Sequence, residues 1–235
     1  MEHQRVLRLL DRGVNVEHPR VARIVRDAMG ELEQVADEEL NGWPDVKKRC
    51  FLVACKLNVT LALEKMKRHA SWSRRTLPVA LTVGIRAELA KGKLEVTDYV
   101  DLERGSPILV VRSKRFDPRI RNLDDSVSAT LIVLEQMLRK SSSGQICLYY
   151  DRSEFCQHTN WDIEYLQTII GVLSANYPES LSCVYIYPTD GPIGMLWPLV
   201  RASMDERTAS KVVMPATVDE LLDAIPSALL PKLLH

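Results

Sequence analysis

The sequence predicts an α/β protein in which an N-terminal helical subdomain is followed by a mainly parallel β-sheet with flanking helices. Two patterns carry this prediction. Residues 1 to about 90 show helical spacing of apolar residues and no convincing strand. From Pro107 onward, short apolar runs alternate with longer amphipathic segments, an order that favours crossover connections between parallel strands. We therefore expect a helical subdomain at 1–90 and a second domain at 91–235.

Helices account for the N-terminal part. The segment 20–40 carries apolar residues at helical spacing, and Asn58 is a predicted N-cap for a helix from about Val59 to Trp72. The segment 81–104 is polar and irregular and is interrupted by glycines, so we expect it to be a connection between the two domains.

Strands and helices alternate in the second domain. In the helix expected at 123–140, leucines and valines form one apolar stripe that would cover a face of the sheet. The expected strands are 107–112, 145–151, 182–187 and 211–214, and the expected helices are about 123–140, 161–175, 192–204 and 217–224.

Composition excludes several classes of function. The formal net charge is zero, which argues against a nucleic-acid partner, since such proteins usually show a basic stripe. The five cysteines are an odd number, and Cys147 and Cys183 lie in apolar strand-like runs, so free buried thiols are expected. No signal peptide or bilayer-length apolar run is present in the sequence. We therefore expect a cytoplasmic or peripheral membrane protein.

Cysteine and histidine spacing does not predict a metal. Cys156-x-His158 and the Cys50, Cys55 pair lack the paired spacing of a zinc site. The sequence between Pro188 and Met195 contains no complete phosphate-binding loop. We expect no cofactor.

Three carboxylates raise the question of catalysis. Asp151, Glu154 and Asp162 could pair as an acid and a base, but Asp151 closes an apolar strand, a position more typical of a cap or turn. No serine lies in a nucleophile elbow. The prediction is that the protein is not an enzyme and has no catalytic residues, while a hydrolase using Asp151 and His158 remains a weaker alternative.

The segment 177–212 is the most informative of the chain. An alternating strand ends at Pro188, and an unusually apolar amphipathic helix follows. Gly191 and Gly194 at its start provide a flexible backbone, and Pro198 removes a hydrogen bond inside it. These features favour a kinked and loosely anchored helix over an ordinary sheet-covering one.

Motifs along most of residues 45–232 resemble the CRAL-TRIO (Sec-fourteen-like) lipid-binding domain. The resemblance rests on YPESL, Trp197-x-x-Val200-Arg201 and Met204-x-x-x-Thr208-x-x-Lys211-Val212, and upstream on SPILVVRSKRFDP, ICLYYDRSEF and CFLVACKLNVTLALEKMKRHASWSRR. The chain departs from the family pattern in several places. Ala202 and Ser203 replace a usual Pro-Phe, Cys55 replaces a frequent Arg, and Glu154 stands where the family has the glycine of Asp-x-x-Gly.

The resemblance implies an apolar lipid cavity between the sheet and a mobile gate helix. The residues expected to line the cavity or the gate are Ile193, Met195, Leu196, Trp197, Leu199, Val200 and Met204. It also implies a lipid headgroup site formed by Glu179, Thr208, Lys211 and Lys56, a set that suits an inositol phosphate because it combines cations, a hydroxyl and a carboxylate. Ile146 and Leu148 replace the small hydroxyl residues of phosphatidylcholine-binding members, which disfavours that lipid.

The expected function is non-catalytic binding of one lipid, phosphatidylinositol or a phosphoinositide, and its transfer or presentation at a transiently contacted membrane. Two alternatives remain open. One is a protein-interaction module with a degenerate cavity, and the other is a carrier of an apolar ligand such as a sterol or tocopherol. Basic residues available for an anionic membrane are Arg74, Arg75, Lys114, Arg115, Arg119 and Arg121.

Overall fold

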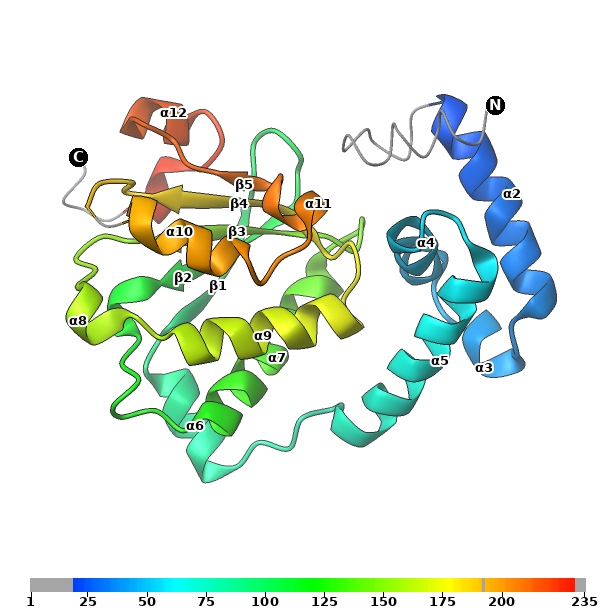
Figure 1. The fold of residues 1–235 in the computed structure, drawn as a ribbon, viewed down its shortest axis with the longest axis horizontal. Coiled ribbons are helices and arrows are strands. Elements are labelled where there is room, and N and C mark those ends of the chain that lie inside the picture. The colour runs from blue at the N-terminus through cyan, green and yellow to red at the C-terminus, as the bar shows by residue number, and fades with distance from the viewer. Residues whose placement is uncertain (1–18, 192, 231–235) are drawn as a thin grey trace. The chain divides into compact units, whose positions relative to one another are not determined.

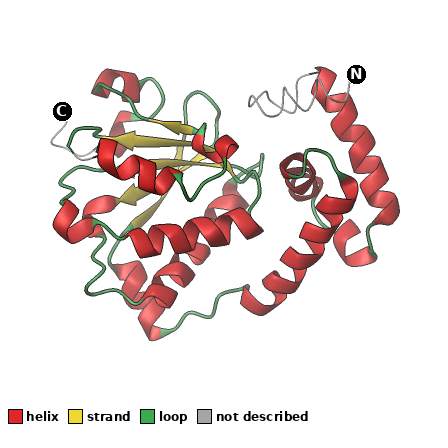
Figure 2. Cartoon of the chain, viewed as in Figure 1, coloured by secondary structure: helices red, strands yellow, loops and turns green. Residues whose placement is uncertain are grey.

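The computed structural model describes residues 19–191 and 193–230, which fall into two compact units (Figure 1). Among the described residues, the helical unit contains those up to Leu77 together with Ala175–Glu179, and the sheet unit contains Pro78–Ser174 and those from Ser180 onward. Figure 2 shows that the described strands all belong to the sheet unit.

The helical unit contains α2 (Pro19–Val35), α3 (Glu38–Asn41), α4 (Asp45–Ala54) and α5 (Val59–Thr76). The prediction for Asn58 is confirmed, because its side chain accepts a hydrogen bond from Leu61 N at 3.0 Å and caps α5. The apolar pattern of 20–40 divides between α2 and α3, where Asp37 caps the second helix. Side chains from all four helices form one buried core.

An aromatic cluster surrounds His69 in this unit. Its ring centroid lies 5.4 Å from that of Trp43 and 5.5 Å from that of Trp72, and Phe51 and Tyr177 pack nearby. The imidazole is only 3 % exposed, and burial, with the charge of Lys47 as a second cause, lowers its pKa to about 4. His69 is therefore a neutral core residue at physiological pH.

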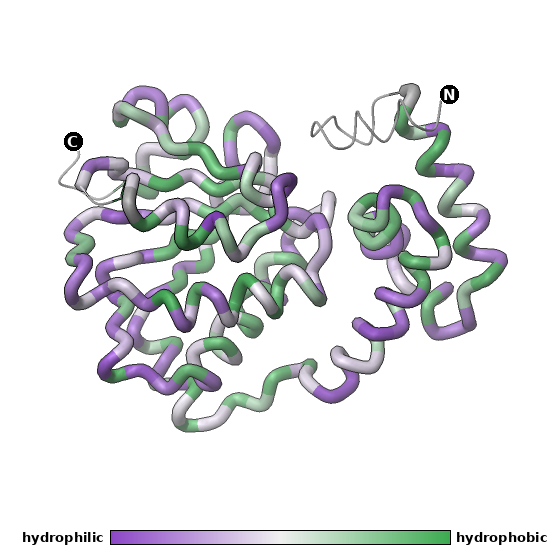
Figure 3. Tube along the Cα trace, in the orientation of Figure 1, coloured by the Kyte–Doolittle hydropathy of each residue, from purple (hydrophilic) through white to green (hydrophobic). Residues whose placement is uncertain are grey.

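The sheet unit is built on five strands in the order β1-β2-β3-β4-β5. β1 pairs with β2 in antiparallel fashion, and the remaining pairs are parallel, so the predicted mainly parallel sheet is confirmed. The strands are β1 (Leu94–Val100), β2 (Pro107–Arg112), β3 (Ile146–Asp151), β4 (Leu181–Tyr187) and β5 (Val212–Val213). Figure 3 colours the chain by hydropathy, and β2 is buried from Pro107 to Val111, as expected for an inner strand.

The two faces of the sheet are covered by different parts of the chain. Val111 of β2 and Tyr150 of β3 pack with side chains of α7 (Leu123–Lys140) and α9 (Ile163–Asn176). The opposite face, which we call the C-terminal face, packs against α12 (Val218–Leu222) and η2 (Ser227–Leu229). The shorter elements are η1 (Ser113–Arg115), α8 (Gln157–Asn160), α10 (Ile193–Arg201) and α11 (Glu206–Ala209).

The expectation of an irregular connection at 81–104 was wrong. This segment contains α6 (Val83–Ala90) and the edge strand β1. Thr82 caps α6 by accepting a hydrogen bond from Ile85 N. Glu88 within the helix is buried and forms ion pairs with Lys91 and Lys93. Paired charges therefore occupy positions where a sequence pattern would require apolar residues.

Candidate functional site

Lys56 and Glu179, two of the four predicted headgroup residues, have left-handed backbone in the helical unit. Their φ angles are 51° and 56°. Among the described non-glycine residues, only Leu57 and Glu154 also have a positive φ. A side chain with a Cβ disfavours this conformation by roughly 1–2 kcal/mol, so the surrounding turns must impose it. Lys56 follows α4 and is exposed, whereas Glu179 lies in the turn before β4 and is partly buried.

Thr208 and Lys211 lie together in the sheet unit. Thr208 is in α11, and Lys211 N donates to Thr208 O at 3.1 Å as the chain leaves this short helix. The Thr208 hydroxyl donates to Asp205 Oδ2 at 2.7 Å, so its proton already has an acceptor. Asp205 also caps α11, and these hydrogen bonds lower the pKa of its carboxyl against the opposing effect of burial.

The ammonium of Lys211 is fixed at the start of β4. Lys211 Nζ donates to Leu181 O at 2.7 Å, and the backbone carbonyl of Lys211 accepts from Val184 N at 2.9 Å as β5 begins. The side chain is partly buried. Lys211 therefore places a positive charge at the first residue of β4, while Lys56 and Glu179 belong to the other unit.

The apolar helix α10 is shorter than predicted. It ends at Arg201, and Met204 lies beyond it in the turn that precedes α11. Leu196 is buried, whereas Leu199 is 54 % exposed, so the helix is apolar on more than its buried side. Ile193, Trp197 and Val200 are partly buried, and the side chain of Met195 lies outside the described residues.

Arg152 fixes the loop that leads into α10, a role that sequence reasoning missed. Its guanidinium donates to Pro188 O at 2.7 Å and to Asp190 O at 3.1 Å, and its backbone N donates to Tyr187 O. The residue is 7 % exposed, and burial lowers its pKa.

The replacement of the family's glycine by Glu154 also has a structural explanation. Glu154, which replaces the glycine of Asp-x-x-Gly, has φ 60°. The backbone thus keeps the conformation that glycine adopts without cost. Asp151 accepts from Ser153 N at 2.9 Å and pairs with Arg112 at 2.9 Å, so its role as a turn cap is confirmed.

Most of the basic residues considered for membrane attraction are paired with carboxylates. Arg121 is buried against Asp162 and Glu164, and Arg119 pairs with Asp117. Lys114 pairs with Glu154, and Arg74 pairs with Glu39. These ion pairs reduce the free positive charge available to an anionic surface.

A cavity of about 20 Å³, the size of one water molecule, lies away from α10. It is lined by polar and apolar residues of the sheet unit: Glu88, Leu89, Lys93, Leu94, Ser126, Ala129 and Thr130. Across residues 19–191 and 193–230, no group of three or more His, Cys, Asp or Glu side chains is arranged to hold a metal ion. In the same ranges no helix has the length and apolar character to cross a bilayer.

Comparisons with known proteins agree with this architecture. The family model for the CRAL/TRIO domain matches residues 91–234. A protein named phosphatidylinositol transfer protein CSR1, from Eremothecium gossypii, is 25 % identical over 194 residues, which are 80 % of this chain and 43 % of that relative. This chain therefore spans less than half of the relative's length. The crystal structure of Sfh5 aligns with a TM-score of 0.58 at 16 % identity, covering 91 % of this chain and 80 % of that one.

Proposed function

The chain belongs to the CRAL/TRIO domain family, and from this we propose that it binds a single lipid and transfers or presents it at membranes without chemical change. The family match over residues 91–234 is the observation that carries the proposal. The name of the Eremothecium relative supports phosphatidylinositol, or one of its phosphates, as the lipid. We further propose that the protein acts as a cytoplasmic monomer that contacts membranes transiently.

The helix α10 is the proposed gate of a lipid cavity, which is distinct from the water-sized cavity described above. Extracting a lipid requires apolar protein surface to replace the bilayer, at roughly 0.8 kcal/mol per buried methylene. Leu196 and Leu199 give the helix apolar side chains in both buried and exposed positions. The remaining proposed lining and gate residues are Ile193, Met195, Trp197, Val200 and Met204.

Two features of the chain around α10 support movement of this helix. Pro198 cannot donate the hydrogen bond that a helix interior normally makes, so α10 is internally weakened. Its preceding loop contains Gly191 at φ 71°, while Arg152 holds Pro188 and Asp190 just before it. The fixed loop and the weakened helix suit a gate that pivots between residues 190 and 198.

Lys211 is the proposed cation for the lipid phosphate, and Thr208, Glu179 and Lys56 are proposed to act with it. Charge-assisted hydrogen bonds to phosphate contribute about 1.5–3 kcal/mol each. Because the Thr208 hydroxyl donates to Asp205, its oxygen is available as an acceptor for an inositol hydroxyl rather than as a donor to phosphate. This assigns different parts of the headgroup to neighbouring residues.

The test measures transfer of labelled phosphatidylinositol and labelled phosphatidylcholine between vesicles. Lys211→Ala is expected to slow transfer of phosphatidylinositol about ten-fold or more, because 1.4 kcal/mol corresponds to a factor of ten. Lys140→Ala is the matched control, since Lys140 forms an exposed ion pair with Asp98 elsewhere in the sheet unit. Equal transfer by Lys211→Ala and wild type would refute the headgroup assignment.

Native mass spectrometry of the purified protein separates the remaining possibilities. A co-purifying inositol lipid supports the proposal. A bound sterol-like molecule without inositol lipid would replace it with an apolar carrier. A protein that takes up no lipid from vesicles would instead favour an interaction module with a degenerate cavity.

A further inference from the structure

Two cysteines face each other across adjacent strands in the middle of the sheet. Cys147 on β3 and Cys183 on β4 are register partners, and their sulfur atoms are 3.3 Å apart. The side chains are 0 % and 1 % exposed, and both are free thiols. The contact is a sulfur–sulfur hydrogen bond within the core beneath the C-terminal face.

The distance between the strands is compatible with a covalent link. Neighbouring strands lie about 4.8 Å apart, which falls inside the range of about 4.4–6.8 Å between the Cα atoms of disulfide-bonded residues. A disulfide brings the sulfurs to about 2 Å, so the two side chains must approach by little more than 1 Å. Rotation about the Cα–Cβ bonds, with a small shift of the strands, supplies this movement.

The surroundings distinguish the two thiols. Hydrogen bonding to Cys147 lowers the pKa of Cys183 against the opposing effect of burial, and the positive charge of Arg104 lowers it further. The same hydrogen bond, together with burial, raises the pKa of Cys147. Arg104 is placed by a hydrogen bond from Nη1 to Tyr185 OH at 2.8 Å, on the strand that carries Cys183. Cys183 is therefore the thiol that forms a thiolate more readily.

We propose that Cys147 and Cys183 are a redox-active dithiol that a peroxide converts reversibly into a disulfide joining β3 and β4. The Cys183 thiolate attacks one peroxide oxygen, the O–O bond breaks, and water leaves after protonation, giving a sulfenic acid. The Cys147 sulfur then attacks that sulfur as its thiol proton passes to the departing hydroxide, so the S–O bond breaks and a second water leaves. Two electrons pass from the sulfurs to the peroxide, and a thiol reductant reverses the reaction.

Access to the pair depends on the segments that cover the C-terminal face. Leu221 and Ile225 share the core cluster of the two cysteines, and Leu102 N donates to Ala224 O at 2.9 Å, linking the loop after β1 to this cover. Because these segments form the cover, oxidation requires their transient opening. The reaction of the pair is therefore expected to be slower than that of the exposed Cys156.

The experiment exposes native wild-type protein to hydrogen peroxide, then unfolds it and alkylates the remaining thiols. Digestion with trypsin and a glutamate-specific protease places Cys147, Cys156 and Cys183 on different peptides, because Arg152, Glu154 and Glu179 separate them. The expected product is a linked Cys147–Cys183 pair, lighter by two hydrogen atoms and restored to free thiols by a reductant. Cys156 reports that the oxidant has acted. Oxidised Cys156 with Cys147 and Cys183 both still alkylated, or carrying unlinked sulfinic acids, would overturn the proposal.

Arg104→Gln tests the assignment of Cys183 as the attacking thiol. Loss of the nearby positive charge is expected to slow formation of the disulfide several-fold. Arg119→Gln is the matched control, because the Arg119 charge acts on Cys156 rather than on the buried pair. Equal rates of disulfide formation for Arg104→Gln and wild type would refute the role of Arg104 and the assignment of Cys183 as the attacking thiol. Slowing by Arg104→Gln but not by Arg119→Gln would support both assignments.

Discussion

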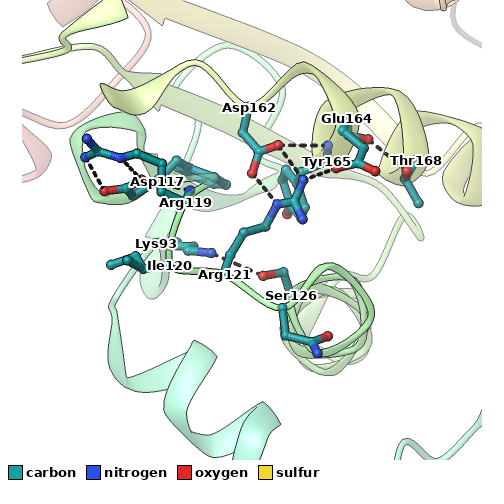
Figure 4. A network of polar contacts seen from close by, with 12 residues as sticks. Lys93, Asp117, Arg119, Ile120, Arg121, Ser126, Asp162, Glu164, Tyr165 and Thr168 are labelled. Carbon is teal, nitrogen blue, oxygen red and sulfur yellow. Dashed lines mark hydrogen bonds and ion pairs between the residues drawn. The ribbon is translucent and has the colours of Figure 1, made fainter. Parts of the chain in front are cut away.

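Replacing Arg121 by alanine is expected to destabilise the sheet unit severely. The side chain is 8 % exposed and donates from Nε to Asp162 Oδ2 at 2.6 Å and from Nη2 to Asp162 Oδ1 at 3.0 Å (Figure 4). It also reaches Glu164 in the first turn of α9. Asp162 is 3 % exposed and accepts a hydrogen bond from Tyr165 N, so Arg121 ties the loop before α7 to the start of α9.

The magnitude follows from the charge that the substitution leaves behind. Removing one partner of a buried ion pair costs about 3–5 kcal/mol because the other charge stays buried without compensation. Asp162 keeps its hydrogen bond from Tyr165 N, which favours the lower end, about 3 kcal/mol. This corresponds to more than a hundred-fold change in the folding equilibrium constant.

Arg119 provides a matched control two residues away. It also forms a two-point ion pair, with Asp117, but its side chain is 64 % exposed. Exposed pairs contribute little to stability, so Arg119→Ala should destabilise the protein far less than Arg121→Ala. Figure 4 shows both arginines in the same loop, which makes burial the principal difference between them.

Urea unfolding followed by far-ultraviolet circular dichroism measures the two losses, and hydrogen exchange of the α9 amides locates them in the sheet unit. A second substitution, Asp162→Asn, should recover part of the loss in the Arg121→Ala background because it removes the uncompensated charge. The reasoning fails if Arg121→Ala and Arg119→Ala differ by less than about 1 kcal/mol, the range of an exposed pair.

Two further predictions concern single residues. The folded-state pKa of His69, about 4, lies below its ordinary value of 6.5, so the unfolded chain takes up a proton first as pH falls. The free energy of unfolding should therefore drop by at most about 3 kcal/mol between pH 6.5 and pH 4. His69→Gln should flatten this part of a urea-denaturation pH series. At φ 60°, Glu154→Gly should be more stable than Glu154→Ala by about 0.5–1 kcal/mol, the reverse of the usual order, and equal or lower stability of the glycine variant in thermal unfolding would contradict the backbone argument.

The regular elements of the sheet unit were predictable because their apolar periodicity is strong. The bounds Leu123–Lys140 and Pro107–Arg112 agree with expectation, and both elements bury continuous apolar surface. β1 was missed because it is an edge strand whose Glu95, Asp98 and Tyr99 are exposed. A strand of this kind has few apolar residues to distinguish it from a loop.

The candidate site was predictable to a different degree. The apolar character of α10 and the spacing of Thr208 and Lys211 are local properties, so the sequence contains them. The contacts of Arg152 with the loop before α10 join residues 36 and 38 positions apart in the chain, and no local pattern encodes them. The donation by Thr208 to Asp205 spans three residues, but the capping role of Asp205 becomes evident only once α11 is known to begin there.

The sequential strand order has a consequence for synthesis of the chain on the ribosome. From β1 to β5 each new strand pairs with the one made just before it, so the sheet can grow at one edge as the polypeptide emerges. The helices α7 and α9 are synthesised between the strands and can cover their face as the sheet grows. The C-terminal face stays uncovered until residues 218–230 have been synthesised. A nascent chain halted before Val218 would leave Ile108, Tyr149 and Tyr185 open to solvent, and would be a substrate for chaperones until translation resumed.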